Sequence, residues 1–312
     1  MIEKVIEYPF GITSYIGKNY GSAKMNSEFR RIVPEGAKVE RLGTGFQFTE
    51  GPVWNVKGEY LLFSDIPASR IKKWTAEDGI SDFRFPSGKS NGLTLDRSGR
   101  LIACEHANRR VSRTEEDGTI VTIASHYKGK KLNSPNDVVV KADGSVYFTD
   151  PPYGLNPIFG TFEEQELAFY GVYRVSPNGD NLSLLIDDSV PNGLAFSPDE
   201  SLLYVADTEM NHIRVFNVNE DGKTTNGRIF VEISGEPLAP DGLKVDSEGN
   251  VYVTGKGGIW VLNPEGRRLG TISVPELPAN LCWGDRDWKT LYITARSSLY
   301  RVRLNMAGIP LP

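Results

Sequence analysis

The chain has 312 residues, 39% of them hydrophobic, and a formal net charge of −5 at pH 7. The lack of a basic excess argues against a nucleic-acid or anionic-membrane partner. No apolar run reaches the ~18 residues that a membrane-spanning helix needs. The first residues, MIEKVIEYPFGITSYIGKNY, lack the basic and apolar regions of an export signal, which favours a cytoplasmic location.

Residues 1–36 stand apart from the repeating pattern that follows them. This segment contains the aromatic residues Tyr8, Phe10, Tyr15, Tyr20 and Phe29. Such a content indicates that the segment packs on something. We expect an N-terminal arm that lies either on the rest of its own chain or on a partner subunit, and the second case would give a homo-oligomer.

From residue 50 onward a short phrase returns six times, as in EGPVW, NGLTLD and DGLKVD. Each phrase begins with an oxygen-bearing side chain, and the six lead residues are Glu50, Asn91, Asn136, Asn192, Asp241 and Asn280. A tight turn and a second apolar run follow each phrase. Turns such as Ser98-Gly99 and Asp143-Gly144 are typical of hairpins between short antiparallel strands.

The repeats predict an all-β protein, a six-bladed β-propeller formed by residues 37–312. A small antiparallel sheet cannot bury both faces alone, whereas radial packing buries each sheet against its neighbours. The last repeat stops after three strands, near residues 298–303. We therefore expect residues 37–42 to supply the missing fourth strand and to close the ring.

In a propeller the innermost strands line the central channel, so the lead residues should surround one mouth of it. Asn-Gly and Asp-Gly are also common turn formers, which is the alternative explanation. Glu50 and the pair Asn136-Asp137 do not fit that explanation. Carboxylate and amide oxygens suit a hard dication, and Glu50 and Asp241 could neutralise it. Calcium is the expected ion, with magnesium, manganese and zinc as alternatives.

Several strings resemble the gluconolactonase/regucalcin (senescence marker protein) family of six-bladed propellers. They are FTEGPVW (48–54), LNSPNDVVVKADGSVYFTDPPYG (132–154), PNGLAFSPDESLLYVAD (191–207) and PDGLKVD (240–246). The segment ACEHANRRVSRTEEDG (103–118) is similar to the bacterial gluconolactonase branch. The resemblance extends from about residue 40 to residue 305.

This resemblance implies a metal-dependent lactonase and a set of metal ligands. The family's metal-binding Glu, Asn and Asp match Glu50, Asn192 and Asp241, and its Asn at the metal or substrate matches Asn136. Regucalcin-like members carry an Arg where this chain has Ser134, so sugar recognition must differ here. A related branch of the family hydrolyses organophosphates.

The second strand of each repeat returns to the mouth, so the loop after it should overhang the site. These loops contain Glu105, His106, Tyr153 and Arg296, which we expect to contact substrate together with Asn136. The stretch from residue 151 to about residue 170 is long for a loop within a blade. Loops of this length often act as lids, and we expect it to cover the mouth.

These features together predict hydrolysis of a sugar lactone, such as an aldono-1,5-lactone, to the aldonic acid. A dication would polarise the carbonyl, and Asp241 is the expected general base. A nucleophilic role for Asp241 is the alternative mechanism. Two alternative functions are hydrolysis of an organophosphate-type ester at the same metal and a non-catalytic calcium-binding propeller.

Overall fold

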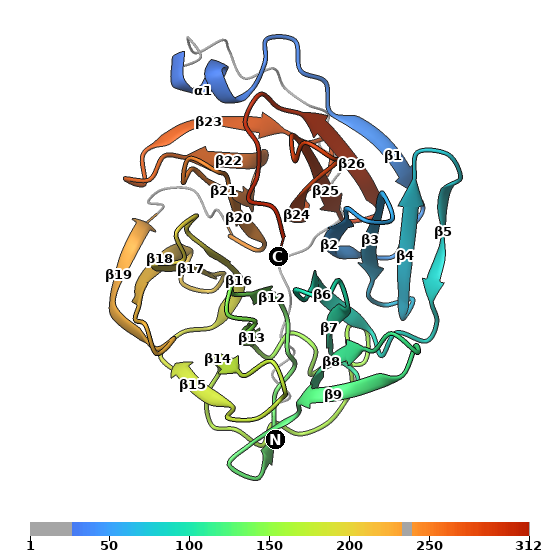
Figure 1. Cartoon of the computed structure of the whole chain (residues 1–312), viewed down its shortest axis with the longest axis vertical. Coiled ribbons are helices and arrows are strands. Elements are labelled where there is room, and N and C mark those ends of the chain that lie inside the picture. Colours follow the sequence, from blue (N-terminus) through green and yellow to red (C-terminus); the bar gives the residue numbers. More distant parts are fainter. Residues whose placement is uncertain (1–26, 233–238, 312) are drawn as a thin grey trace, which may run out of the picture.

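The computed structural model describes residues 27–232 and 239–311. Six four-stranded antiparallel sheets surround a central channel, and five of them consist of four consecutive strands running from the centre to the rim (Figure 1). The six-bladed propeller predicted from the repeats is therefore confirmed. The aromatic residues predicted to anchor the arm lie outside the described residues, apart from Phe29.

The blades are numbered in chain order, and their strands run from the channel outward. Blade 1 contains β2 (Thr49–Asn55), β3 (Tyr60–Asp65), β4 (Arg70–Thr75) and β5 (Gly79–Arg84). Blade 2 contains β6 (Ser90–Leu95), β7 (Leu101–Glu105), β8 (Arg110–Thr114) and β9 (Ile120–Ala124). Blade 3 contains β12 (Val138–Val140), β13 (Val146–Asp150), β14 (Gly171–Val175) and β15 (Ser183–Ile186). A small hairpin of β10 (His126–Tyr127) and β11 (Lys130–Lys131) precedes blade 3.

The other three blades follow the same plan. Blade 4 contains β16 (Pro191–Phe196), β17 (Leu202–Asp207), β18 (His212–Val218) and β19 (Thr224–Glu232). Blade 5 contains β20 (Leu243–Val245), β21 (Val251–Gly255), β22 (Gly258–Leu262) and β23 (Arg268–Ser273). Blade 6 contains β24 (Pro278–Gly284), β25 (Thr290–Ala295), β26 (Ser298–Arg303) and, as its outer strand, β1 (Glu40–Thr44).

The ring is closed by pairing between the two ends of the repeat array. Strand β1 lies antiparallel to β26, with Glu40 opposite Arg301 and Thr44 opposite Ser298 (Figure 1). The predicted donor segment, residues 37–42, overlaps this strand, which begins three residues later and ends two residues later. The prediction that the N-terminal side completes blade 6 is confirmed.

Burial follows the position of a strand within its blade. The second strands β13 and β25 are buried along their whole length, because neighbouring blades cover both of their faces. The outer strand β19 is mostly exposed. The predicted hairpin turns are also present, since Gly99 and Gly144 have φ values of 79° and 84° that favour glycine. Strand alternation and turn chemistry thus account for the local structure.

A short helix, α1 (Ser27–Ile32), lies against the propeller and was not anticipated from the sequence. Its side chains Phe29 and Ile32 are buried in the core shared by blades 5, 6 and 1. Gly270 in β23 leaves room for the Phe29 ring, because a Cβ there would lie 2.6 Å from it. This part of the predicted arm therefore packs on its own propeller. Within the described ranges, no helix has the length and apolar character needed to cross a membrane.

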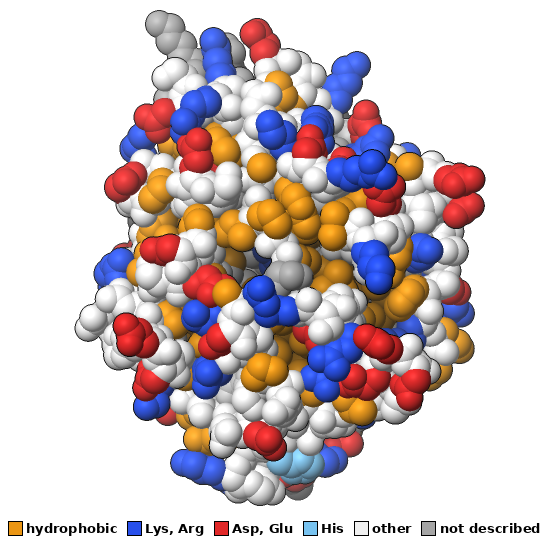
Figure 2. Space-filling model, in the orientation of Figure 1, with side chains coloured by type: hydrophobic (Ala, Val, Ile, Leu, Met, Phe, Trp, Pro, Cys, Tyr) orange, Lys and Arg blue, Asp and Glu red, His pale blue; other side chains and the backbone are white. Residues whose placement is uncertain are grey.

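The last residues of the chain cover one end of the channel. Gly308 forms an isolated bridge with Asp246, at the end of the blade 5 inner strand. Ile309 packs against the cluster of blades 4 and 5, and Leu311 against the inner strands of blades 1 and 2. The C-terminus accordingly lies at the centre of Figure 1, and Figure 2 shows hydrophobic side chains gathered around the centre of this face. The lead residues are at the opposite end of the inner strands.

Candidate active site

The six lead residues meet at the mouth of the channel, and their side chains contact one another. Five of them are at most 5% exposed, and Asp241 is half-buried. Asn280 Nδ2 donates to Glu50 Oε2 at 2.9 Å, joining blades 6 and 1. Asn91 Nδ2 donates to Asn136 Oδ1 at 2.5 Å, and Asn136 Nδ2 to Asn192 Oδ1 at 3.3 Å, joining blades 2, 3 and 4. We call these six residues the inner ring.

Glycines that follow the lead residues let the inner strands approach closely. The Gly92 N–H donates to the Asn136 carbonyl at 2.7 Å, and the Gly193 N–H to the Asp241 carbonyl at 3.1 Å. A Cβ on Gly92 would lie only 2.5 Å from that carbonyl oxygen. Neither glycine has a positive φ. These two Asn-Gly pairs therefore serve close contact between blades.

Irregular strand pairing directs the lead side chains into the channel. The pairing register shifts at residues 50–53 in β2, 90–93 in β6 and 191–194 in β16, directly at the lead residues. Such bulges bend a strand and change the direction in which a side chain points. The same irregularity in several blades explains how equivalent residues converge on one mouth.

Two carboxylates of the inner ring have raised pKa values. Burial, followed by the charge of Asp137, raises the pKa of Glu50 to about 7, against smaller opposing effects of hydrogen bonds and of Lys244. Burial and the charges of Glu50 and Asp137 hold the pKa of Asp241 well above its ordinary range. Two like charges in a buried ring are unfavourable without a counter-ion. The pair would be relieved by a cation between them.

The residue types of the inner ring are those that a hard dication takes. Glu50 and Asp241 would supply carboxylate oxygens, and Asn192 and Asn136 amide oxygens, which here accept hydrogen bonds from neighbouring amides. In the described part of the chain no three Asp, Glu, His or Cys side chains form a metal-binding group. Any metal here would depend on the amide oxygens, which calcium accepts readily and softer metals do not prefer.

His106 supports the inner ring by contacting Asn91 on one side and the loop carbonyl of Phe159 on the other. Its side chain is buried, with Nε2 3.3 Å from Asn91 Nδ2 and Nδ1 3.1 Å from the Phe159 carbonyl oxygen. Burial lowers the pKa of His106 to about 4, and the Lys89 charge acts in the same direction. The neutral ring therefore donates from Nδ1 to Phe159 and accepts from Asn91 at Nε2. This arrangement orients the Asn91 amide.

The long loop of blade 3, residues 151–170, extends over the mouth side of blades 1 and 2. Lys89 Nζ donates to the Pro157 carbonyl at 2.5 Å, and the rings of Phe48 and Phe159 meet edge to face at 5.2 Å. Gly154 lies against the His106 ring, where a Cβ would be 2.6 Å from it. The loop is thus on the face where a lid was predicted. Its influence on substrate choice stays a prediction.

Tyr153 lies close to Asp241 of the inner ring. Thr208 lies close to Asn192 of the inner ring. The Tyr153 hydroxyl is buried and has no hydrogen-bond partner of normal geometry among the described residues. Burial raises its pKa, and the charge of Asp241 contributes. Thr208 Oγ1 accepts from Asn192 Nδ2 at 2.9 Å and donates to the Pro240 carbonyl at 2.6 Å. The sequence places Thr208 in a loop over the mouth but assigns it no role, because a lone Thr in a loop carries no pattern.

Glu105 and Arg296, two predicted substrate contacts, are not brought into the inner ring. Both Glu105 oxygens are already engaged, with Asn108, Arg110 and Ser112 in its own blade. Arg296 is exposed in the turn between β25 and β26, and its carbonyl accepts the Thr49 N–H at 2.7 Å. Glu105 therefore holds blade 2 together instead of facing the ring.

Below the inner ring, a charge pair that the sequence did not reveal joins blade 3 to blade 5. Asp137 Oδ2 in blade 3 is 3.6 Å from Lys244 Nζ in blade 5. The Asp137 side chain is only 3% exposed. Both residues follow a lead residue in the repeated phrase, which was the available signal. Only the ring arrangement makes residues from these non-neighbouring blades meet.

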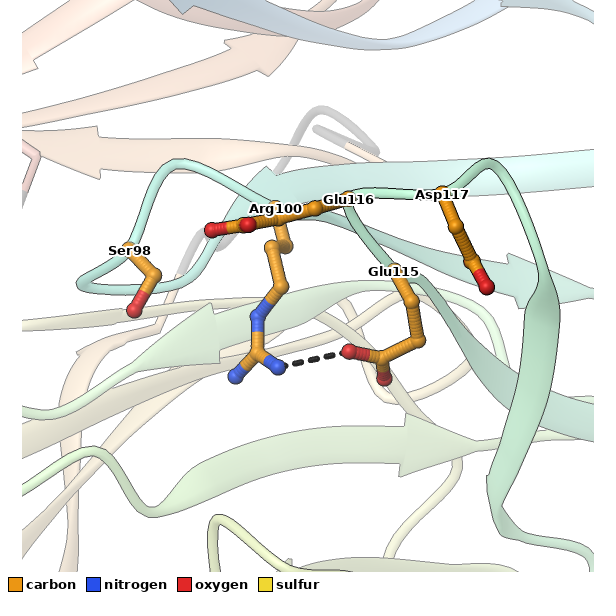
Figure 3. A pocket seen from close by; sticks show the side chains of 5 residues that line it. All are labelled: Ser98, Arg100, Glu115, Glu116 and Asp117. Carbon is orange, nitrogen blue, oxygen red and sulfur yellow. Dashed lines mark hydrogen bonds and ion pairs between the residues drawn. The ribbon is translucent and has the colours of Figure 1, made fainter.

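A surface depression of about 360 Å³ lies away from this site, between turns at the far end of blade 2. It is lined by Ser98, Arg100, Glu115, Glu116 and Asp117 (Figure 3). Arg100 is held by Asp96 and Glu115, both at 2.7 Å. Because its one cation already has two carboxylate partners, the depression offers no comparable binding chemistry.

The raised pKa of Glu50 predicts how the metal-free protein responds to pH. The pKa of Glu50 is 4.5 in the unfolded chain, its ordinary value, and about 7 in the folded protein. The stability from this group is present below pH 4.5 and is lost as pH rises through 7, by about 3 kcal/mol. We expect Glu50→Gln to stabilise the chelated protein increasingly between pH 4.5 and 7.5, measured by denaturant unfolding. A pH-independent difference between variant and parent would contradict this.

Comparison with known proteins places these features in a family. The SMP-30/gluconolactonase/LRE-like region matches residues 48–297. The gluconolactonase of Zymomonas mobilis is 35% identical, over 95% of this chain and 88% of that protein. A pentonolactonase of Haloferax volcanii is 26% identical, over 80% of this chain and 82% of that protein.

Solved structures agree with the sequence comparison. A gluconolactonase of Xanthomonas campestris superimposes with a TM-score of 0.83 and 33% identity, covering 89% of this chain and 93% of that one. The likeness thus extends over most of the propeller. On these matches, the chain belongs to the SMP-30/gluconolactonase/LRE-like family.

Proposed function

We propose that this chain is a lactonase that opens a sugar lactone, of the aldono-1,5-lactone class, to the aldonic acid with the help of a dication. The observation that carries the proposal is the presence of two carboxylates, buried Glu50 and half-buried Asp241, together with amide side chains at the channel mouth. The gluconolactonase and pentonolactonase relatives support the substrate class. Calcium is the favoured ion because every donor is a hard oxygen.

The residues divide into ligands, a base and positioning groups. Glu50, Asn192 and Asp241 would hold the dication, with Asn136 in or beside its shell. When bound, a dication polarises the lactone carbonyl and stabilises the oxyanion. Asn280 fixes the Glu50 carboxylate, and the chain from His106 through Asn91 fixes the Asn136 amide. The loop at residues 151–170 limits access of bulk water to the mouth.

Asp241 is the proposed general base. Its carboxylate accepts a proton from water while the water oxygen bonds to the carbonyl carbon. The ring C–O bond then breaks, and the leaving alkoxide takes the proton held by Asp241, which gives the open hydroxy acid and regenerates the Asp241 carboxylate. In the alternative mechanism the Asp241 oxygen attacks the carbonyl carbon itself, and water releases the acyl intermediate. His106 is an unsuitable acid, since its pKa is about 4.

Chelation and metal replacement test the proposed function. We expect exhaustive chelation to abolish hydrolysis of aldonolactones and to lower the melting temperature, because a ligand of the folded state stabilises it. Calcium should restore both properties more fully than magnesium, manganese or zinc. Rates on a lactone panel, with a phosphotriester included, identify the substrate class.

Full activity in metal-free protein would end the metal-dependent proposal. A faster rate on the phosphotriester than on any lactone would favour the organophosphate alternative. Calcium binding without turnover of any substrate would favour a non-catalytic propeller.

A further inference from the structure

The charge pair beneath the inner ring joins two blades that are not neighbours. Asp137 belongs to blade 3 and Lys244 to blade 5, so blade 4 lies between them at the rim. Their side chains meet at 3.6 Å only because both point into the channel. Lys244 Nζ also donates to the Leu243 carbonyl at 3.0 Å, which holds the ammonium in the channel.

Asp137 is a carboxylate with few other partners. Its Oδ1 accepts the Val138 N–H at 2.9 Å, whereas Oδ2 is buried without a hydrogen bond from any described residue. A Cβ on Gly92 would lie 2.9 Å from Oδ1, so blade 2 closes one side of it. A buried charge without a counter-charge is strongly unfavourable. The ammonium of Lys244 lies close enough to supply the counter-charge.

The charges in the channel balance when one dication is present. The inner ring contributes the carboxylates of Glu50 and Asp241, and the layer beneath it contributes Asp137 and Lys244. Three carboxylates and one ammonium leave two negative charges. One dication neutralises them, whereas loss of the ammonium would leave one charge unbalanced.

We propose that Lys244 is a built-in cation of the channel that neutralises Asp137 and thereby sets the affinity of the inner ring for its dication. This inference rests on the metal site of the proposed function. Lys244 would act on the ligands through its charge alone, so it is a positioning residue. It acts on the metal through charge at short range, where little water screens the interaction.

Calcium titration of chelated protein, followed by calorimetry, tests the inference. We expect Lys244→Met to bind calcium at least tenfold more tightly than the parent, because the repulsion of the ammonium is gone. Asp137→Asn should bind at least tenfold more weakly. The double variant should return to within about threefold of the parent, since it restores the charge balance.

Lys141→Met is the matched control. Lys141 has a similar exposure to Lys244 and pairs with Glu200 at 2.9 Å, at the other end of the blade 3 inner strand. Its calcium affinity should stay within twofold of the parent. Unchanged affinity in Lys244→Met, or a shift in the same direction in both single variants, would overturn the inference. If Lys244→Met does not fold, Lys244→Arg should keep the parent affinity while Asp137→Asn loses it.

A second measurement separates this inference from the proposed function. If the parent binds no dication, the metal-dependent function fails, and the pair is judged from melting temperatures of metal-free protein. There, Lys244→Met should lower the melting temperature by leaving Asp137 uncompensated, and the double variant should recover most of the loss. Additive effects of the two substitutions would overturn the charge pairing itself.

Discussion

Asp241→Asn is expected to lower the rate of lactone hydrolysis by 10²–10⁴-fold, the usual contribution of a general base. The amide keeps an oxygen for the metal but cannot accept a proton from water. The rate should therefore stay low even when metal is shown to be bound. The measurement is kcat across a calcium titration, with occupancy followed independently by calorimetry.

Asp188→Asn is the control for removal of an acidic group. Asp188 is exposed and pairs with Arg214 at 2.6 Å, outside the inner ring. Its substitution should leave kcat within twofold of the parent. If metal-saturated Asp241→Asn turns over lactone at close to the parent rate, Asp241 is a ligand only, and another group must take the proton.

Glu50→Gln is expected to weaken calcium binding by roughly 100-fold or more, since even a supporting contact of a metal site is worth 10–100-fold. The amide oxygen can still accept from Gly51 and Asn280, whose N–H groups bind the Glu50 carboxylate at 2.6 and 2.9 Å. The ring should thus keep its shape and lose mainly charge. Excess calcium should restore a large part of kcat, unlike in Asp241→Asn.

Glu59→Gln serves as the control for that variant. Glu59 is in the turn after β2, at the other end of the same strand, and pairs with Arg286 at the surface. Its calcium affinity should match that of the parent. A Glu50→Gln protein with parental affinity would remove Glu50 from the ligand set. A variant that stays inactive at saturating calcium would assign Glu50 a role in the chemistry as well.

The fold could be predicted from the sequence because its determinants are local. Short alternating strands and glycine turns are encoded within each repeat, and a missing strand in the last repeat indicated how the ring closes. Helix α1 was not predicted because six residues carry too little periodic signal. It forms where Phe29 finds a space above Gly270, a contact that only the folded ring provides.

The inner ring was predicted as a set because its members share a position in the repeat. The role of the glycines in the inner ring was not predicted, because a glycine at a close contact between blades looks the same in the sequence as a glycine in a turn. His106 was assigned to the substrate, yet the loop carbonyl of Phe159 makes it a support for Asn91. Such roles depend on which groups lie behind a side chain.

The equivalent placement of six oxygen side chains at the start of six inner strands follows from the sequence alone, because each repeat encodes the same turn and strand. Only the tertiary structure decided which charges meet. The charge of Glu50 raises the pKa of Asp241, and Asp137 faces Lys244, because ring closure brings blades distant in sequence to one channel. Electrostatic energies depend on the separation and the burial of the charges, and the repeated sequence specifies neither quantity.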